Sequence, residues 1–177
     1  MLFSERSLWT MIHGIGLGGG ALLALGAALF ALYLLRAGDL RSTGAGRASG
    51  PMAGLTAFTA LMLWLTSIVG MFVVFPPYRA TPPEGTTDLA PFPRALVLAD
   101  PETAWLHAFG METKEHLPWI AAMLATAVAF VAWRHRAKLF EDPHLRRMGT
   151  ILLVICFVGV AYTSLLGVFL NKVAPLE

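Results

Sequence analysis

The sequence predicts an all-α integral membrane protein: a four-transmembrane-helix bundle with a proline-rich outer loop that carries a short interfacial helix. Three observations lead to this fold class. The 177 residues are 56% hydrophobic and 14% charged, whereas soluble domains carry about 25% charged residues. The apolar residues form four separate runs, and each run reaches the length of about 17–25 residues that a spanning helix needs. Eight of the 13 Lys and Arg residues lie in two short connections between the runs.

The four runs are interpreted as helices in one membrane domain that covers the whole chain, 1–177. The spans are expected at about 8–36, 53–76, 115–135 and 149–171. Helix is the expected conformation because lipid offers no hydrogen-bond partner to backbone N–H and C=O groups. The first run is far longer than the h-region of a signal peptide, which is about 7–15 residues, so we interpret it as a retained helix.

The connections after the first and third spans are short and basic. They hold Arg36, Arg41 and Arg47 in the first case, and Arg134, Arg136, Lys138, Arg146 and Arg147 in the second. The positive-inside rule places short basic loops in the cytoplasm. Both termini and the 76–116 loop are therefore expected on the outer side of a bacterial inner membrane.

The 76–116 loop divides into two parts. Prolines recur throughout 76–93, so this part cannot be a continuous helix, and we expect an extended cover with a turn near Glu84–Gly85. Asp100 followed by Pro101 then provides a capping side chain and a favourable first helical residue. A short helix is expected to follow, to end at Gly110 and to lie flat at the membrane surface.

Three of the five histidines are predicted on the outer side: His13, His107 and His116. His13 lies within the first span, where an ionisable residue is costly and indicates function by default. At α-helical spacing His13, Gly16 and Gly20 share one stripe, so the histidine would project from a face with room for a flat group such as a porphyrin. The same glycines also fit the G-x-x-x-G packing pattern of membrane helices, and His13 would then hydrogen-bond a neighbouring helix.

The segment 105–116 supplies a second set of candidate ligands. His107, Met111 and His116 offer two imidazoles and a thioether, which suit haem iron, copper or zinc. Their spacing matches no established metal motif, and the alternative is an amphipathic interfacial segment whose charges reach water.

The first and third spans run in the same direction, so His13 and His116 could face each other across the bundle. With four spans and outer histidines, the chain resembles small four-helix membrane proteins related to the b-type cytochromes, and uncharacterised bacterial inner-membrane proteins of similar size. The resemblance implies one b-type haem near the outer face, with His13 and His116 as axial ligands and His107 able to replace either. It also implies electron transfer between quinol or a periplasmic carrier and a partner complex.

Three functions are therefore weighed. The first is an electron-transfer subunit that holds one b-type haem and acts with a larger respiratory or photosynthetic complex, its partners being the bilayer, other membrane subunits, and quinol or a soluble cytochrome c. The second is a cofactor-free accessory subunit of such a complex. The third is a periplasmic-side metal-binding membrane protein that uses His107, Met111 and His116. The net charge of +2 is too small to imply nucleic acid.

Overall fold

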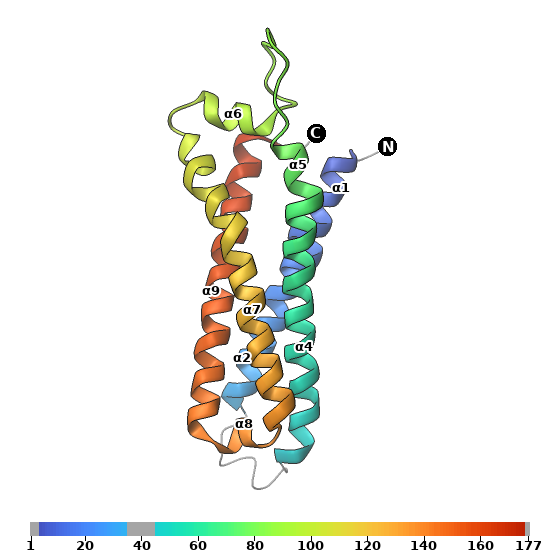
Figure 1. Cartoon of the computed structure of the whole chain (residues 1–177), viewed down its shortest axis with the longest axis vertical. Helices are drawn as coiled ribbons and strands as arrows, with labels where there is room; N and C mark the ends of the chain where they lie inside the picture. Colours follow the sequence, from blue (N-terminus) through green and yellow to red (C-terminus); the bar gives the residue numbers. More distant parts are fainter. Residues whose placement is uncertain (1–3, 35–44, 176–177) are drawn as a thin grey trace.

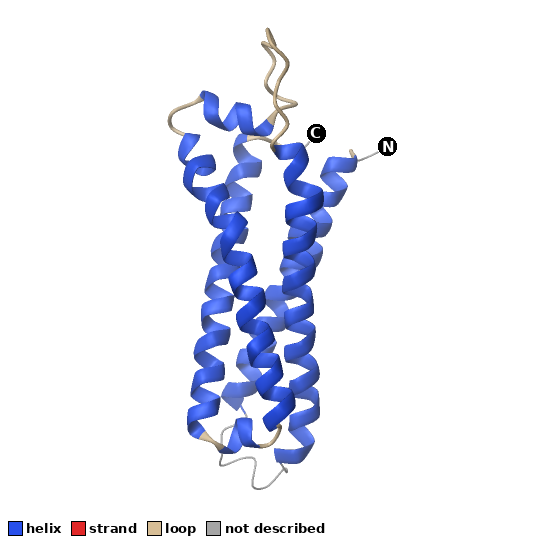
Figure 2. Ribbon diagram, in the orientation of Figure 1, coloured by secondary structure: helices blue, strands red, loops and turns tan. Residues whose placement is uncertain are grey.

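The computed structural model describes residues 4–34 and 45–175, and within these ranges it is all-helical, with no strand (Figure 2). Four helices lie side by side, alternating in direction, along the long axis of the molecule (Figure 1). Each is long and apolar enough to cross a membrane: Glu5–Leu34, Ser49–Tyr78, Leu106–His135 and Pro143–Val173. The predicted all-helical architecture with four helices of spanning length is confirmed.

The first long helix consists of α1 (Glu5–Met11), the π-helical segment η1 (Ile12–Gly18) and α2 (Gly19–Leu34). It begins before the predicted residue 8 because the side chain of Ser4 accepts a hydrogen bond from the backbone N–H of Ser7 at 3.1 Å. Such a cap satisfies one of the free N–H groups of a first helical turn. The predicted end of this span at residue 36, and the basic side chains of Arg36 and Arg41, lie outside the described residues.

The second long helix consists of α4 (Ala45–Val69), the π-helical segment η2 (Gly70–Val74) and α5 (Phe75–Tyr78). It therefore extends beyond the predicted span of 53–76 at both ends. A helix need not stop where its apolar run stops, because polar flanking residues continue the backbone hydrogen bonds and extend toward water.

The third and fourth long helices also exceed their predicted spans. The third consists of the π-helical segment η3 (Leu106–Met111) and α7 (Glu112–His135), and the fourth is α9 (Pro143–Val173). The short helix α8 (Lys138–Glu141) joins them. At the start of α9, the Asp142 carboxylate accepts a hydrogen bond from the backbone N–H of His144 at 2.8 Å.

The outer loop confirms one prediction and corrects another. The turn at Glu84–Gly85 is present, and Gly85 has a φ of 80°, a value that favours glycine. The helix predicted after Asp100 is helical from residue 104 onward, but it continues into the third long helix, and 101–103 form a turn in which the Asp100 carboxylate accepts from the N–H of Glu102 at 2.9 Å. A separate short helix that was not predicted, α6 (Pro93–Ala99), lies across the end of the bundle (Figure 1).

Gly110 does not end a helix, contrary to the prediction. It lies within η3 and is buried against α9, where a Cβ on Gly110 would stand 3.6 Å from Leu166. Thr113 is also inside the helix, since its hydroxyl donates to the carbonyl of Phe109 at 2.8 Å. The absence of a side chain at Gly110 permits close helix packing here, and the third long helix runs on through residues that the sequence assigned to the loop.

The main core lies among the four long helices. Its centre contains the fully buried side chains of Leu25, Leu63 and Leu153, with small residues such as Ala28 and Ala125 between them. Small residues let membrane helices approach closely. A second cluster packs α6 onto the end of the bundle and consists of Phe75, Val97, Leu106, Met111, Leu170 and Ala174.

Candidate functional site

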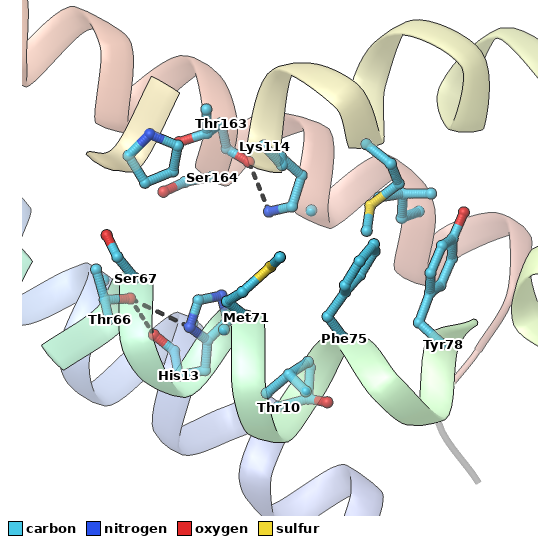
Figure 3. Close-up of a pocket in the computed structure, with 18 of the residues that line it drawn as sticks. Thr10, His13, Thr66, Ser67, Met71, Phe75, Tyr78, Lys114, Thr163 and Ser164 are labelled. Atoms are coloured by element: carbon cyan, nitrogen blue, oxygen red, sulfur yellow. Dashed lines mark hydrogen bonds between the residues drawn. The ribbon is translucent and has the colours of Figure 1, made fainter. Parts of the chain in front are cut away.

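A cavity of about 380 Å³ opens between the four long helices in the half of the molecule that carries α6, and we call it the outer cavity (Figure 3). Most of its lining is apolar. The polar side chains that line it include Thr10, His13, Thr66, Ser67, Lys114, Thr163 and Ser164. An apolar pocket of this size with a few convergent polar groups is typical of a small-molecule or cofactor site.

His13 is held in the outer cavity by Thr66. It lies in η1, and its Nδ1 atom is 3.2 Å from the Thr66 hydroxyl oxygen. The same hydroxyl donates its hydrogen to the backbone oxygen of His13, also at 3.2 Å. A hydroxyl has one hydrogen to donate, so the Thr66 oxygen must accept from an N–H at Nδ1. This assignment of the tautomer leaves the Nε2 lone pair of His13 free to bind a metal or to accept a proton.

Gly70 makes room for the His13 ring. A Cβ on Gly70 would stand 2.6 Å from Cε1 of His13, which is closer than van der Waals contact permits. Gly70 begins the π-helical segment η2, and His13 lies in the π-helical segment η1. Single π-helical turns are often found at functional sites. The ring thus packs directly on the backbone of the second long helix.

The glycines near His13 differ from those expected. The stripe of His13, Gly16 and Gly20 assumed α-helical spacing, but the π-helical hydrogen bonds of η1 connect residues five apart. Gly18, not Gly16, therefore follows His13 on the same side, and a Cβ on Gly18 would stand 3.3 Å from the His13 carbonyl oxygen. Gly16 is exposed with open space around it, and Gly20 packs on Met62. Neither Gly16 nor Gly20 lines the outer cavity.

His107 and His116 do not join His13. His107 lies in η3, and its Nδ1 atom is 3.1 Å from the hydroxyl of Tyr78 at the end of α5. His116 is exposed, and its Nδ1 atom bonds the backbone oxygen of Glu112 at 2.8 Å. All five histidines are among the described residues, and His13 alone of them lines the outer cavity.

Three methionines line the outer cavity: Met11 at the end of α1, Met71 in η2 and the buried Met111 at the end of η3. A thioether is a known ligand of haem iron and of copper(I). Within 4–34 and 45–175, no group of three or more His, Cys, Asp or Glu side chains is placed to share a metal ion.

Lys114 lines the outer cavity, although the sequence did not single it out. The sequence placed it in the 76–116 loop, but it lies in α7, on the side of the cavity opposite His13 (Figure 3). Its ammonium donates to the backbone oxygen of Thr163 in α9 at 3.0 Å. In the sequence, Lys114 lies four residues after Gly110. This spacing would place Lys114 on the same helix face as Gly110 only if the helix continued through the glycine.

No family model, no curated protein and no solved structure matches this chain. The site is therefore interpreted from its own geometry. It combines an imidazole nitrogen that is free to act as a ligand, three thioethers and the cationic side chains of Lys114 and Arg6 in a largely apolar cavity. This set of groups suits the binding of a large apolar molecule with a metal or an acidic group.

Proposed function

We propose that this chain is a membrane-embedded electron-transfer subunit that holds one b-type haem in the outer cavity and acts with a larger respiratory or photosynthetic complex. The observation that carries the proposal is His13. Its Nδ1 is bound to Thr66, and its Nε2 is free, at the wall of an apolar cavity between four helices. Histidines that ligate metals characteristically use their other ring nitrogen for such a second hydrogen bond.

The residues around His13 fit a haem. Gly14 lines the outer cavity next to His13, and a Cβ there would have nothing within 4 Å, which leaves space beside the ring for a flat macrocycle. A bound haem would supply a one-electron redox centre. His13 would hold the iron, and Met71 or Met111, which line the same cavity, would supply a second ligand. This ligand set replaces the expected pair of His13 with His116 or His107, which the structure does not bring together.

The distribution of charge supports an orientation in a bacterial inner membrane. Arg134, Arg136 and Lys138 lie at the end of the bundle opposite α6, and basic ends face the cytoplasm. Both termini and the 76–116 loop then face outward, and the outer cavity lies near the outer face. Quinol in the bilayer or a soluble cytochrome c outside it is the proposed electron partner.

Haem content tests this function. The full chain is expressed in haem-replete bacteria, purified in mild detergent and assayed for non-covalently bound haem b. We expect one haem per chain in the wild type and almost none in His13→Ala. A folded wild-type protein without haem would contradict the proposal.

A cofactor-free accessory subunit is the second candidate. It is favoured by the half of the bundle opposite α6, where the core residues that the structure describes are apolar and pack against one another. Co-purification with a larger complex, in preparations that contain no haem, would support it. Purification as a lone, stable monomer would count against it.

The metal-binding alternative has less support. Neither His107 nor His116 lines the outer cavity, and within 4–34 and 45–175 no three His, Cys, Asp or Glu side chains are placed to share a metal ion. Metal analysis of the wild type against His116→Ala tests it, and we expect an unchanged content of copper and zinc.

A further inference from the structure

We infer that the outer cavity recognises a carboxylate on an apolar body, and that Lys114 binds this carboxylate. The inference rests on the function proposed above, because the two propionates of haem are carboxylates of this kind. A long-chain fatty acid from the bilayer presents the same chemistry. Lys114 is thus assigned to the acidic group of the ligand, whereas His13 is assigned to the iron.

The position of Lys114 is fixed by the two helices that it joins. Its ammonium reaches from α7 to α9, where it donates to the backbone oxygen of Thr163 at 3.0 Å. A Cβ on Gly167 would stand 3.1 Å from the Lys114 nitrogen, so the glycine leaves the space that the ammonium occupies. Figure 3 shows the side chain at the wall of the outer cavity, pointing toward its interior.

The ammonium of Lys114 lacks a countercharge in the described part of the chain. Thr163 provides a neutral carbonyl oxygen, and no carboxylate of residues 4–34 and 45–175 lies within ion-pair distance of the nitrogen. An ammonium carries three N–H donors. A cation in an apolar site is costly unless it is paired, so an anionic ligand would both neutralise the charge and use the remaining donors.

The rest of the outer cavity suits the apolar part of such a ligand. Its apolar lining includes Ile15, Leu63, Val74, Phe75, Trp119 and Val160. Glu115 is the one acidic residue in the lining, and it follows Lys114 in α7, so it projects about 100° further around the helix. Glu115 therefore provides a matched control: a neighbouring charge in the same cavity that is not assigned to the ligand.

The test compares an acid with its ester. Metal-free protoporphyrin IX, its dimethyl ester and oleate are titrated against the purified full chain in detergent, and binding is followed by quenching of tryptophan fluorescence. Without iron, ligation by His13 does not contribute. A charge-assisted hydrogen bond predicts that the wild type binds the acid about 10- to 100-fold more tightly than the ester. This ratio is expected to fall to about one in Lys114→Met, and to persist in Lys114→Arg and Glu115→Gln.

The outcomes separate this inference from the haem function. Equal binding of acid and ester by the wild type, or an unchanged ratio in a folded Lys114→Met variant, would overturn the role of Lys114 even if haem binds. Binding of oleate that depends on Lys114, without binding of either porphyrin, would keep this inference and overturn the haem function. Failure to bind any of the three probes would overturn the inference. Circular dichroism of each variant verifies that it is folded.

Discussion

The imidazole of His13 occupies the space that a side chain at Gly70 would fill. A Cβ on Gly70 would lie 2.6 Å from Cε1 and 3.3 Å from Nε2 of His13. The two residues come from facing helices, each in a π-helical segment. Gly70 therefore sets the position of His13, the proposed iron ligand, although Gly70 itself would not contact the iron.

Gly70→Ala should displace His13. The added methyl group forces the ring or the helix to move, and overpacking of this kind costs about 1–3 kcal/mol. We expect a lower melting temperature and a loss of bound haem. Gly54→Ala is the control, because a Cβ there meets open space, and it should leave both unchanged or raise the stability slightly. Normal haem content in Gly70→Ala would show that the His13 position does not depend on this contact.

Thr66→Val should weaken haem binding without removing the iron ligand. The hydroxyl of Thr66 holds the Nδ1 atom and the backbone oxygen of His13, each at 3.2 Å. Loss of such a second hydrogen bond lowers metal affinity about 10- to 100-fold. Thr66→Ser keeps the hydroxyl and should restore most of the affinity. Haem titrations of the three proteins measure the effect, and equal affinity of Thr66→Val and the wild type would contradict the assigned tautomer.

Tyr78→Phe should loosen the outer end of the bundle. The Tyr78 hydroxyl bonds Nδ1 of His107 at 3.1 Å and so connects α5 to η3. A hydrogen bond of this kind contributes about 0.5–1.5 kcal/mol. We expect limited proteolysis within 79–92 to be about 2- to 10-fold faster, whereas Tyr162→Phe, at an exposed position in α9, should have no effect. Identical cleavage rates in Tyr78→Phe and the wild type would exclude this role.

The sidedness of the bundle can be tested with cysteine labelling. The buried Cys156 is first removed by the substitution Cys156→Ser. Thr87→Cys and Lys138→Cys then place one thiol at an exposed position at each end of the molecule. A membrane-impermeant maleimide should label Thr87→Cys in intact cells and Lys138→Cys only after lysis. The reverse pattern would place the outer cavity on the cytoplasmic side.

The four long helices were predictable from the sequence, because apolar runs of spanning length have one conformation that satisfies the backbone in lipid. Their ends were not, since Ser4, Asp142 and the polar first turn of α7 extend them beyond the apolar runs. Gly110 misled the prediction for a different reason. Its role depends on packing against Leu166 of α9, and such a contact between distant segments leaves no local signal.

The candidate site was predictable only in part. His13 was recognised because an ionisable residue in a span is unusual, and Met111 because a thioether is a potential ligand. The π-helical register of η1 could not be predicted from the sequence. Gly16 and Gly20 were therefore expected beside the cofactor, whereas Gly18 and Gly70 line the cavity. Lys114 was missed because its place in a helix depends on the continuation through Gly110.

We propose that His13, and not His116, holds a haem in the outer cavity. The most direct measurement is the dithionite-reduced minus oxidised absorption spectrum of the purified wild type, His13→Ala and His116→Ala. We expect a b-type α band in the wild type and in His116→Ala, and its loss in His13→Ala. A wild type without the band, or a band that survives in His13→Ala and disappears in His116→Ala, would contradict the proposal.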